Sequence, residues 1–455
     1  MAKFKTYEKY TYSDYFKAEL PEGWMEKSLN HISAYDKNSF VDGPFGSDLK
    51  SSDYKESGIP LIQLNNIREG KHVLQNYKFI NEKKRVELSR HVALPNDIII
   101  AKMAEPVARS AIVSDKYPEY VIVADCVKLS PDLSLINLSF LNWAINSDLV
   151  KMNAELVSSG TTRIRISLGE LKKLKIPYPS LIEQKKIANF LDYQTAKIDT
   201  LIDKQQTLIQ LLKEKRQAVI SHAVTKGLNP DVPMKDSGVE WLGDVPEHWE
   251  LVPLKYLCNF SGGGTPTKDN LSYWTGGTIP WVSPKDMKSF WIDKTQDYIT
   301  ENAVKESSTK LVKAGSLLMV VRSGILQRTI PIAINTVDVT MNQDMRALQF
   351  NERMTSEYAA NYIVGNVDKL LFTWSKDGAT VESIEQEYLS NSLFPVPPID
   401  EQNKIVDEIN DQMKIFDTLI LKAQEAIQLM QERRTALISA AVTGKIDVRG
   451  WEEAQ

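Results

Sequence analysis

The hydrophobic positions follow two patterns along the chain: a long helical repeat that occurs twice, and shorter strand-like runs elsewhere. The helical pattern covers residues 177–225 and returns over residues 395–443. The two copies align without a gap, and roughly half of their positions are identical. An internal repeat of this length predicts that the chain contains two related structural units.

Apolar positions in each copy are spaced alternately four and three residues apart, which is the a and d spacing of a coiled coil. We assign this seam to Ile187, Leu191, Gln194, Ile198, Leu201, Gln205, Leu208, Leu212, Lys215 and Val219, and in the second copy to Ile405, Ile409, Gln412, Phe416, Leu419, Ala423, Ala426, Met430, Arg433 and Leu437. A lone long helix with an exposed apolar stripe is unfavourable, so we expect the two copies to pair with each other. The alternative is two unrelated bundle helices, but the repeat preserves seam, length and flanks together.

The segments before each helix read as strands separated by turn residues, with one helical stretch in each. In the first segment we expect strands over residues 59–67, 96–103, 108–114 and 120–130, and a helix over residues 139–156. In the second segment we expect strands over residues 278–283, 314–324, 329–335 and 345–350, and a helix over residues 356–372. The predicted fold class is α+β, with two repeated mixed α/β domains joined by two long helices that form an antiparallel coiled coil.

Repeated marks also bound the predicted domains. At the start of each domain the same pattern of three residues occurs: Pro21, Glu22 and Trp24 match Pro246, Glu247 and Trp249. We therefore predict a first domain over residues 1–178, a first long helix over 179–228, a linker over 229–245, a second domain over 246–395, a second long helix over 396–446 and a tail over 447–455. The strand ends carry a recurring basic residue, since Lys102 follows one apolar run and Arg322 follows another.

Charge changes the picture because no domain is strongly basic. The net charge is −4, and residues 1–178 carry 25 Lys and Arg against 22 Asp and Glu. If nucleic acid is the partner, local basic patches or other subunits must supply the phosphate contacts. The chain has no apolar run long enough for a membrane span and no signal-peptide pattern at its start. Cys126 and Cys258 are expected to be reduced and buried, as in a cytoplasmic protein.

Catalytic signatures do not occur in the sequence. There is no phosphate-binding loop, and residues 443–445 read as a helix end with a glycine stop. The glycine-rich residues 261–268 lack dinucleotide spacing, and the histidines lack metal-ligand spacing. No amino-methyltransferase motif and no nucleophile triad is present. The pattern favours a recognition module over a single-chain enzyme, and a two-headed protein-binding scaffold with a coiled-coil spacer is the alternative function.

The residues at several marks carry a family resemblance that covers nearly the whole chain. They are the domain entrances PEGW and PEHWELVPL, the segments DGPFGS (42–47), GGTPT (263–267), IPW (279–281) and SGTTRIRI (159–166), the two helix starts at 177–184 and 395–402, and the helix ends VISHAVTKGL and LISAAVTGKID. Because these motifs occur in this order and several of them occur twice, the chain resembles the DNA-specificity subunit of type I restriction–modification systems. The segment 378–383 departs from the pattern because it lacks the basic pair Arg163 and Arg165.

The resemblance implies two target-recognition domains that each read one half of a split, asymmetric sequence in double-stranded DNA. It implies that the helices act as a spacer and as docking sites for two methylation subunits, with motor-nuclease subunits joining for restriction. S-adenosylmethionine is expected in the methylation subunit, and no cofactor, metal or active site is expected in this chain.

Candidate DNA contacts are polar or basic residues at strand ends and in loops. Arginine suits two-point contact with guanine, and glutamine suits adenine. The alternative for each residue is a solvated charge or a phosphate contact. The predicted set is Lys102, Arg109, Arg163, Arg165, Lys285, Arg322, Ser323, Gln327 and Arg328.

Overall fold

The computed structural model describes residues 4–44, 46–103, 106–160, 163–375 and 382–453. The chain divides into two compact units. The first unit comprises residues up to 205 together with residues from 425 onwards, and the second unit comprises residues 206–424. Each unit therefore contains one half of each long helix together with its own strands and short helices.

Among its described residues, the first unit holds two four-stranded sheets, three two-stranded sheets and four short α-helices. Its elements are β1 (Tyr10–Ser13), β2 (Ala18–Pro21), β3 (Met25–Ser28), β4 (Phe40–Asp42), β5 (Ile59–Ile62), β6 (Ile67–Arg68), β7 (Lys71–His72), β8 (Phe79–Ile80), α1 (Glu82–Glu87), β9 (Val92–Ala93), β10 (Ile98–Ala101), β11 (Ser110–Ile112), β12 (Tyr120–Ile122), β13 (Cys126–Leu129), α2 (Leu138–Ile145), α3 (Asp148–Leu156), α4 (Leu168–Lys173), β14 (Lys175–Tyr178) and the start of α5 (Leu181–Lys226). The sheet orders are β11-β10-β13-β4 and β8-β5-β12-β9.

Strand β10 is apolar throughout because both of its faces are covered. Ile98 and Ile100 point into a core that they share with α2 and the start of α5. Ile99 and Ala101 point into a second core between the two sheets. Alternate side chains of a strand point to opposite faces, so a run of four apolar residues fits a strand buried on both sides.

The second unit repeats this architecture. Its elements are β15 (Met234–Asp236), β16 (Asp244–Pro246), β17 (Glu250–Pro253), β18 (Cys258–Gly262), β19 (Ile279–Val282), β20 (Trp291–Ile292), β21 (Asp297–Ile299), α6 (Glu301–Glu306), β22 (Leu317–Val320), β23 (Ile332–Asn335), β24 (Thr340–Met341), β25 (Met345–Phe350), α7 (Ser356–Gly365), α8 (Val367–Trp374), α9 (Gln386–Asn391), β26 (Leu393–Val396) and the start of α10 (Ile399–Val442). Its main sheet has the order β18-β25-β22-β23-β20, and β21-β19-β24 form the smaller sheet. Leu317 and Met319 of β22 face the helices, whereas Leu318 and Val320 face the smaller core.

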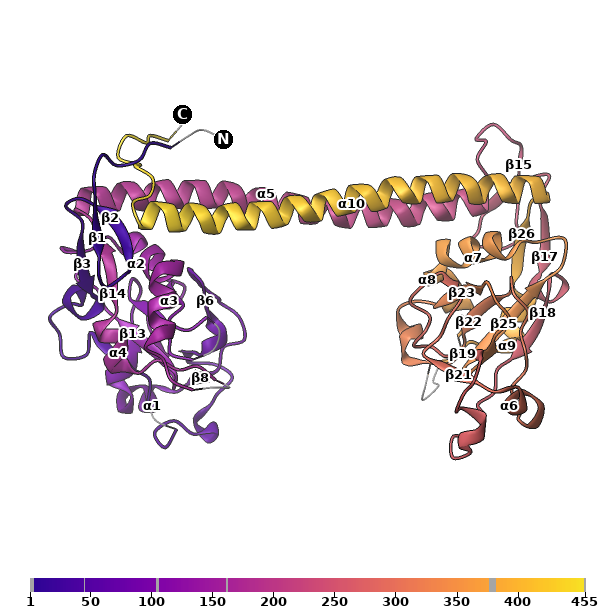
Figure 1. Ribbon diagram of the computed structural model, residues 1–455, viewed down its shortest axis with the longest axis horizontal. Helices are drawn as coiled ribbons and strands as arrows, with labels where there is room; N and C mark the ends of the chain where they lie inside the picture. The colour runs from indigo at the N-terminus through magenta and orange to yellow at the C-terminus, as the bar shows by residue number, and fades with distance from the viewer. Residues whose placement is uncertain (1–3, 45, 104–105, 161–162, 376–381, 454–455) are drawn as a thin grey trace. The chain divides into compact units, whose positions relative to one another are not determined.

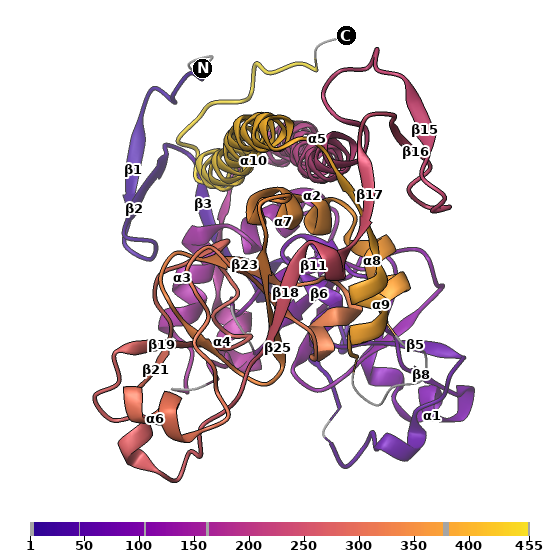
Figure 2. The same cartoon turned by 90° about the vertical axis from the view of Figure 1, so that its right-hand side faces the viewer.

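The two long helices lie side by side and antiparallel, as the sequence predicts (Figure 1). Seen end-on, α7 lies directly beneath the helices in the second unit (Figure 2). The hydroxyl of Tyr358 on α7 donates a 3.0 Å hydrogen bond to the carbonyl of Val224 on α5. In the first unit, the indole N–H of Trp143 on α2 donates to Asp192 of α5 at 2.7 Å. In each unit, one domain helix is therefore hydrogen-bonded to α5: α2 in the first unit and α7 in the second.

The predicted seam includes five exposed residues, and at each of them the next residue along the helix is less exposed; the five are Leu201, Leu208, Lys215, Leu419 and Arg433. Ile198 is buried as expected, but Leu201 is 48% exposed and Leu208 is 42% exposed. Ile202 is 9% exposed and takes the place that was assigned to Leu201. Adjacent apolar residues at 201–202 and 208–209 fit two heptad phases equally well, so spacing alone did not decide between them.

This phase places an arginine of each helix beside an aspartate of the other. Arg434 donates to Asp199 at 2.9 Å in the first unit, and Arg216 donates to Asp417 at 2.6 Å in the second. The two pairs are copies of one pair under the sequence repeat. The predicted polar seam residues Lys215 and Arg433 are both exposed instead.

Four sequence predictions merged elements that the structure separates. The strand expected over residues 59–67 ends at Ile62, and a 3₁₀ helix over Leu64–Asn66 separates β5 from β6. The strand expected over residues 120–130 is two strands, β12 and β13, which are interrupted near Asp125 at φ 66°. The helix expected over 139–156 breaks between α2 and α3, and the one expected over 356–372 breaks at Asn366 between α7 and α8. Short polar residues tolerate these non-helical conformations, which apolar periodicity does not reveal.

The glycine-containing motifs have structural causes. A Cβ on Gly43 would collide with the carbonyl of Val123, and a Cβ on Gly263 would collide with that of Asn342. The two glycines therefore mark the same close approach in each unit. Gly444 has a φ of 70° just beyond α10, which is the expected glycine stop.

The cysteines and the hydropathy of the helices can be compared with the sequence predictions. Cys126 and Cys258 are free and buried, and burial raises the pKa of the Cys126 thiol to about 12. Within the described residues, no helix combines the length and hydropathy that crossing a membrane requires.

Candidate nucleic-acid interface

Lys102 lies at the end of β10 and is held by a carboxylate of its own unit. Its ammonium nitrogen is 3.2 Å from Oδ2 of Asp42, and its side chain is 12% exposed. Asp42 ends strand β4, which is separated from β10 in the sheet by β13. The position of Lys102 at a strand end agrees with the sequence, but its charge is already paired in this structure.

Arg165 lies on a short bridge beside the same strand end. Its backbone pairs with Ser159, with N–O distances of 2.9 and 3.0 Å, and also bridges Met103. The guanidinium donates to the carboxylate of Asp125 and remains half exposed. Arg163, two residues earlier, is exposed. Residues 161–162 of the same predicted motif lie outside the described residues.

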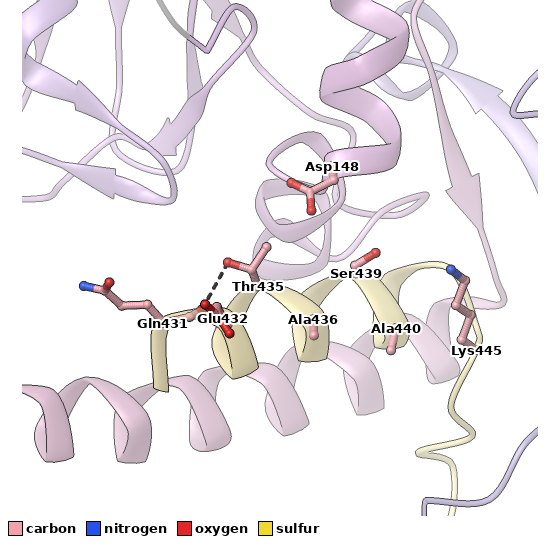
Figure 3. A pocket seen from close by; sticks show the side chains of 8 residues that line it. All are labelled: Asp148, Gln431, Glu432, Thr435, Ala436, Ser439, Ala440 and Lys445. Carbon is pink, nitrogen blue, oxygen red and sulfur yellow. Dashed lines mark hydrogen bonds between the residues drawn. The ribbon is translucent and has the colours of Figure 1, made fainter. Parts of the chain in front are cut away.

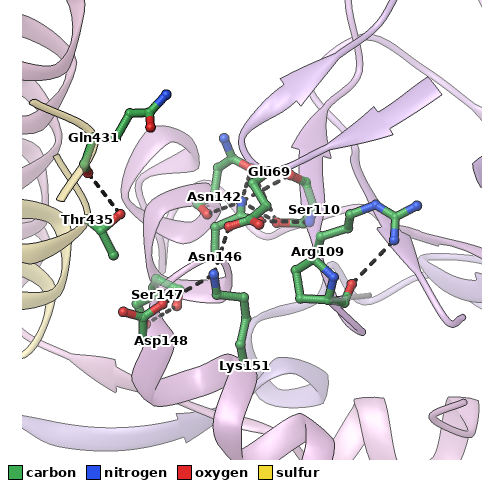
Figure 4. A network of polar contacts seen from close by, with 12 residues as sticks. Glu69, Arg109, Ser110, Asn142, Asn146, Ser147, Asp148, Lys151, Gln431 and Thr435 are labelled. Atoms are coloured by element: carbon green, nitrogen blue, oxygen red, sulfur yellow. Dashed lines mark hydrogen bonds and ion pairs between the residues drawn. The ribbon is translucent and has the colours of Figure 1, made fainter. Parts of the chain in front are cut away.

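Arg109 is inside the first unit, with 6% of its surface exposed. Its guanidinium donates to the carbonyls of Ile67 at 2.8 Å and Leu64 at 2.9 Å, and more weakly to those of Met103 and Pro106. Figure 4 shows it directed away from the polar network of Ser110, Asn142 and Asn146. Burial also lowers its pKa. This placement favours a structural role for Arg109 over contact with DNA.

The second unit gathers four of the predicted residues on one loop after β22. Arg322, Gln327 and Arg328 are exposed. The hydroxyl of Ser323 accepts from the backbone N–H of Ile325 at 3.4 Å and caps the short 3₁₀ helix Gly324–Gln327. Ser323 therefore shapes the loop, and the other three present their side chains to solvent.

Lys285 is exposed on a turn after β19 and lies apart from that loop in sequence. The carboxylate of Asp286 holds the turn by accepting from the backbone N–H and the hydroxyl of Ser283, each at 2.8 Å, and from the N–H of Gln296 at 2.9 Å. Asp286 thus holds the turn, and the lysine side chain is exposed to solvent.

The sequence comparison of Lys102 with Arg322 is wrong by one residue. Ala101 pairs with Cys126 in the first unit, and Val320 pairs with Met345 in the second. The next residues are therefore equivalent, so Val321 occupies the place of Lys102. A shift of one residue turns a strand side chain to the opposite face, which explains why Lys102 is largely buried and Arg322 is exposed.

Sequence reasoning also missed three residues that shape these surfaces: Asp42, Asp125 and Arg346. Gly262 occupies the strand position of Asp42, as their registers with β25 and β13 show. A Cβ on Gly262 would lie 2.7 Å from the guanidinium of Arg346, so the arginine crosses the space that this glycine leaves. The glycine-rich segment was the available signal, but its reason is a contact between strands far apart in sequence.

A hollow of about 610 Å³ lies between the start of α3 and the last turns of α10 (Figure 3). Small and polar side chains line it, among them Thr435, Ser439 and Asp148. The hydroxyl of Thr435 donates to the carbonyl of Gln431 within the helix. The part of the chain that the structure describes holds no cluster of His, Cys, Asp and Glu that could bind a metal ion.

Comparisons with known proteins agree with this two-unit architecture. The family model described as the type I restriction modification DNA specificity domain matches twice, over residues 7–211 and 246–429. The chain is 35% identical over 281 residues to the EcoR124I/EcoR124II specificity subunit of Escherichia coli, covering 60% of this chain and 63% of that relative's length. It is 21% identical to the MjaX specificity subunit of Methanocaldococcus jannaschii, described as putative, over 95% of both chains.

Two solved structures share the fold. The HsdS subunit from Thermoanaerobacter tengcongensis superposes with a TM-score of 0.58 at 16% identity, over 94% of this chain and 99% of that chain. A chain from work on complex assembly and conformational transition of the type I R-M system gives a TM-score of 0.66 at 17% identity, over 94% and 100%.

The chain thus contains two related units, each with a strand-rich domain packed on a pair of antiparallel helices and with exposed arginines on the domain. This duplicated architecture is that of a DNA-recognition protein. The chain belongs to the type I restriction–modification DNA specificity family.

Proposed function

We propose that this chain recognises a split, asymmetric sequence in double-stranded DNA, and that each unit reads one half. The main support for this proposal is that the family model matches twice, once over each strand-rich domain together with the helix that follows it. The relatives are named as specificity subunits of type I restriction enzymes. Each unit has an exposed arginine beside the end of its central strand, Arg165 in the first and Arg322 in the second. These arginines support the proposal, because arginine is the commonest side chain for reading guanine.

The chain supplies recognition, and partner subunits supply the chemistry. Two methylation subunits that bind S-adenosylmethionine would modify adenine, and motor-nuclease subunits would join for restriction in the cytoplasm. The exposed leucines of the long helices, such as Leu201, Leu211 and Leu429, are available for docking. With little net charge of its own, the chain depends on those subunits for much of the phosphate contact.

The test is co-expression of the full chain with the methylation subunit, followed by mapping of methylated adenines across the host genome. The expected result is a motif with two specified blocks separated by unspecified base pairs. The methylation subunit expressed alone is the control and should produce no such motif. A continuous motif would contradict two independent readers. A stable complex without sequence-dependent methylation would favour the protein-binding scaffold.

A further inference from the structure

The two units share one small bridge at the end of their central strands. In the first unit Met103 pairs with Arg165, and in the second unit Arg322 pairs with Ser383. Each bridge is antiparallel and joins the end of a central strand to the segment that precedes α4 or α9.

Hydrogen bonds on one side of the bridge show that the two positions are equivalent. The N–H of Lys102 donates to the carbonyl of Asp125 at 2.8 Å. The N–H of Val321 donates to the carbonyl of Asp344 at 2.9 Å. Each of these donors immediately precedes the bridge residue of its strand.

Hydrogen bonds on the other side agree. The N–H of Ile166 donates to the carbonyl of Lys102 at 3.0 Å, and the N–H of Ile384 donates to the carbonyl of Val321 at 2.8 Å. These backbone contacts together fix one register, in which Arg322 takes the place of Met103 and Ser383 takes the place of Arg165.

Each bridge therefore contains one arginine. In the first unit it lies on the segment before α4, and in the second unit it lies at the end of the central strand. Residues paired across an antiparallel bridge have their side chains on the same face. Arg165 and Arg322 are both exposed, so each unit presents one guanidinium from the same place. The arginine of the second unit thus lies on the strand side of the bridge, and Ser383 stands where the first unit has Arg165. Residues 378–381 of the segment 378–383 lie outside the described residues.

We propose that this bridge is the base-reading position of both units, occupied by Arg165 in the first and Arg322 in the second, and that Asp125 positions Arg165. The inference rests on the proposed function and names the residue that serves each half of the target. Asp125 engages one edge of the Arg165 guanidinium. The remaining N–H groups of the planar fork are then oriented for a guanine edge, because a carboxylate pair restricts the rotation of the side chain.

Asp125 is suited to this task by its backbone. Its φ of 66° lies in the left-handed region, which Asp and Asn adopt more readily than other non-glycine residues. The substitution Asp125→Asn keeps that conformation and one acceptor oxygen but removes the charge. It therefore separates positioning of Arg165 from folding of the loop.

The test uses the complete complex with the methylation subunits. The target of the wild-type chain is first found by methylation mapping, and binding is then measured on duplexes in which each base pair is replaced in turn. Arg165→Ser and Arg322→Met are the main variants. Arg90→Ser and Arg353→Ser are the controls, one in each unit, since both are exposed arginines outside the predicted set of DNA contacts.

We expect each main variant to lose about 5- to 150-fold of discrimination at one base pair, and the two variants to affect opposite halves of the target. The double variants Met103→Arg/Arg165→Ser and Arg322→Met/Ser383→Arg move the arginine across the bridge and should regain discrimination at the same base pair. Asp125→Asn should reduce discrimination at the Arg165 base pair without changing the salt dependence of binding or the melting temperature.

Several results would overturn the inference while leaving the proposed function intact. One is a split target whose discrimination is unchanged in both main variants. Another is uniform weakening on every sequence with a smaller salt slope, which indicates a phosphate contact. Failure of the transposed variants to regain discrimination would overturn the equivalence of the bridge. A wild-type chain with no split target would instead contradict the proposed function itself.

Discussion

The side-chain oxygen of Gln184 accepts a 2.8 Å hydrogen bond from the backbone N–H of Asn137. Gln184 lies in the first turn of α5 and is fully buried, and Asn137 is the N-cap of α2. The amide nitrogen of Gln184 donates to the carbonyl of Pro179 at 3.0 Å. One side chain therefore joins the start of the coiled-coil helix to the start of a domain helix.

The second unit repeats this joint. Gln402 accepts from the N–H of Thr355, the N-cap of α7, at 2.9 Å and donates to the carbonyl of Pro397 at 2.8 Å. The repeated glutamine of the two helix starts thus has a structural cause. It satisfies helix-terminal groups that would otherwise be buried without partners.

We predict that Gln184→Leu destabilises the first unit by about 1–3 kcal/mol, because the buried N–H of Asn137 loses its acceptor. Hydrogen exchange measured by mass spectrometry should show faster exchange in α2 and at the start of α5. Gln206→Leu is the control, since Gln206 is an exposed residue of the same helix. Equal exchange in the two variants would show that the joint contributes little.

Arg109→Ala should act on folding and not on DNA recognition directly. Loss of the guanidinium leaves the carbonyls of Ile67 and Leu64 without their donor, and we expect a cost of about 2–3 kcal/mol in the free energy of unfolding. Arg163→Ala removes an exposed charge and should leave the unfolding transition within about 0.5 kcal/mol of wild type. Urea denaturation followed by fluorescence compares the two. A stable Arg109→Ala variant with weakened DNA binding would return Arg109 to the interface.

The sequence predicted the larger features of the fold because they depend on repetition and period. The seam spacing and the repeat together indicated the antiparallel coiled coil. The apolar runs within residues 96–103 and 314–324 indicated strands, and the structure shows that β10 and β22 are buried on both faces. These signals are local and strong, since burial of a strand or helix face involves every second to fourth residue.

The finer features of the candidate interface depend on contacts between distant segments, which no local pattern reveals. The heptad phase was ambiguous because Leu201 and Ile202 are both apolar. Lys102 and Arg322 both follow apolar runs, yet only strand pairing shows that they face opposite ways. Arg109 looked like a loop arginine until its burial was known. The charge of an arginine alone does not show whether its side chain is a buried hydrogen-bond donor or lies exposed on the surface.

Acidification should destabilise the first unit through His72. This residue is 7% exposed; its Nδ1 accepts from the N–H of Ser114 at 3.1 Å, and its Nε2 lies 3.1 Å from the hydroxyl of Tyr77. Burial lowers the pKa of His72 from 6.5 to about 4. Between these values the unfolded chain binds a proton that the folded chain does not, so stability is complete above pH 6.5 and falls as the pH drops toward 4.

The largest loss that this pKa shift allows is about 3 kcal/mol. His72→Asn keeps an acceptor near the N–H of Ser114 and should flatten the decline in melting temperature between pH 6.5 and 4. His31→Asn is the control, because His31 is exposed. Burial also lowers the pKa of His91, so part of the decline should persist. An unchanged slope in His72→Asn would exclude His72 as the main acid-sensitive group.

The joints between domain and coiled coil predict where one domain can be exchanged for another. Strands β3 and β14 pair in register from Ser28 and Lys175 at one end to Met25 and Tyr178 at the other, so residues 29–174 enter and leave at adjacent points. Gln184 accepts its hydrogen bond from a backbone N–H of that segment, and a grafted domain therefore needs no particular side chain to make this bond. The contact of Trp143 with Asp192 is the side-chain bond that the graft should keep.

We predict that replacing residues 29–174 with the equivalent segment of a relative, with tryptophan retained at the position of Trp143, changes one half of the methylated target and leaves the other half intact. The reason is that the second unit has its own core and its own joint at Gln402. Methylation mapping of the graft, with the wild-type chain mapped in parallel, is the measurement. A graft that assembles with the methylation subunit but alters both halves would mean that the two units do not read DNA independently.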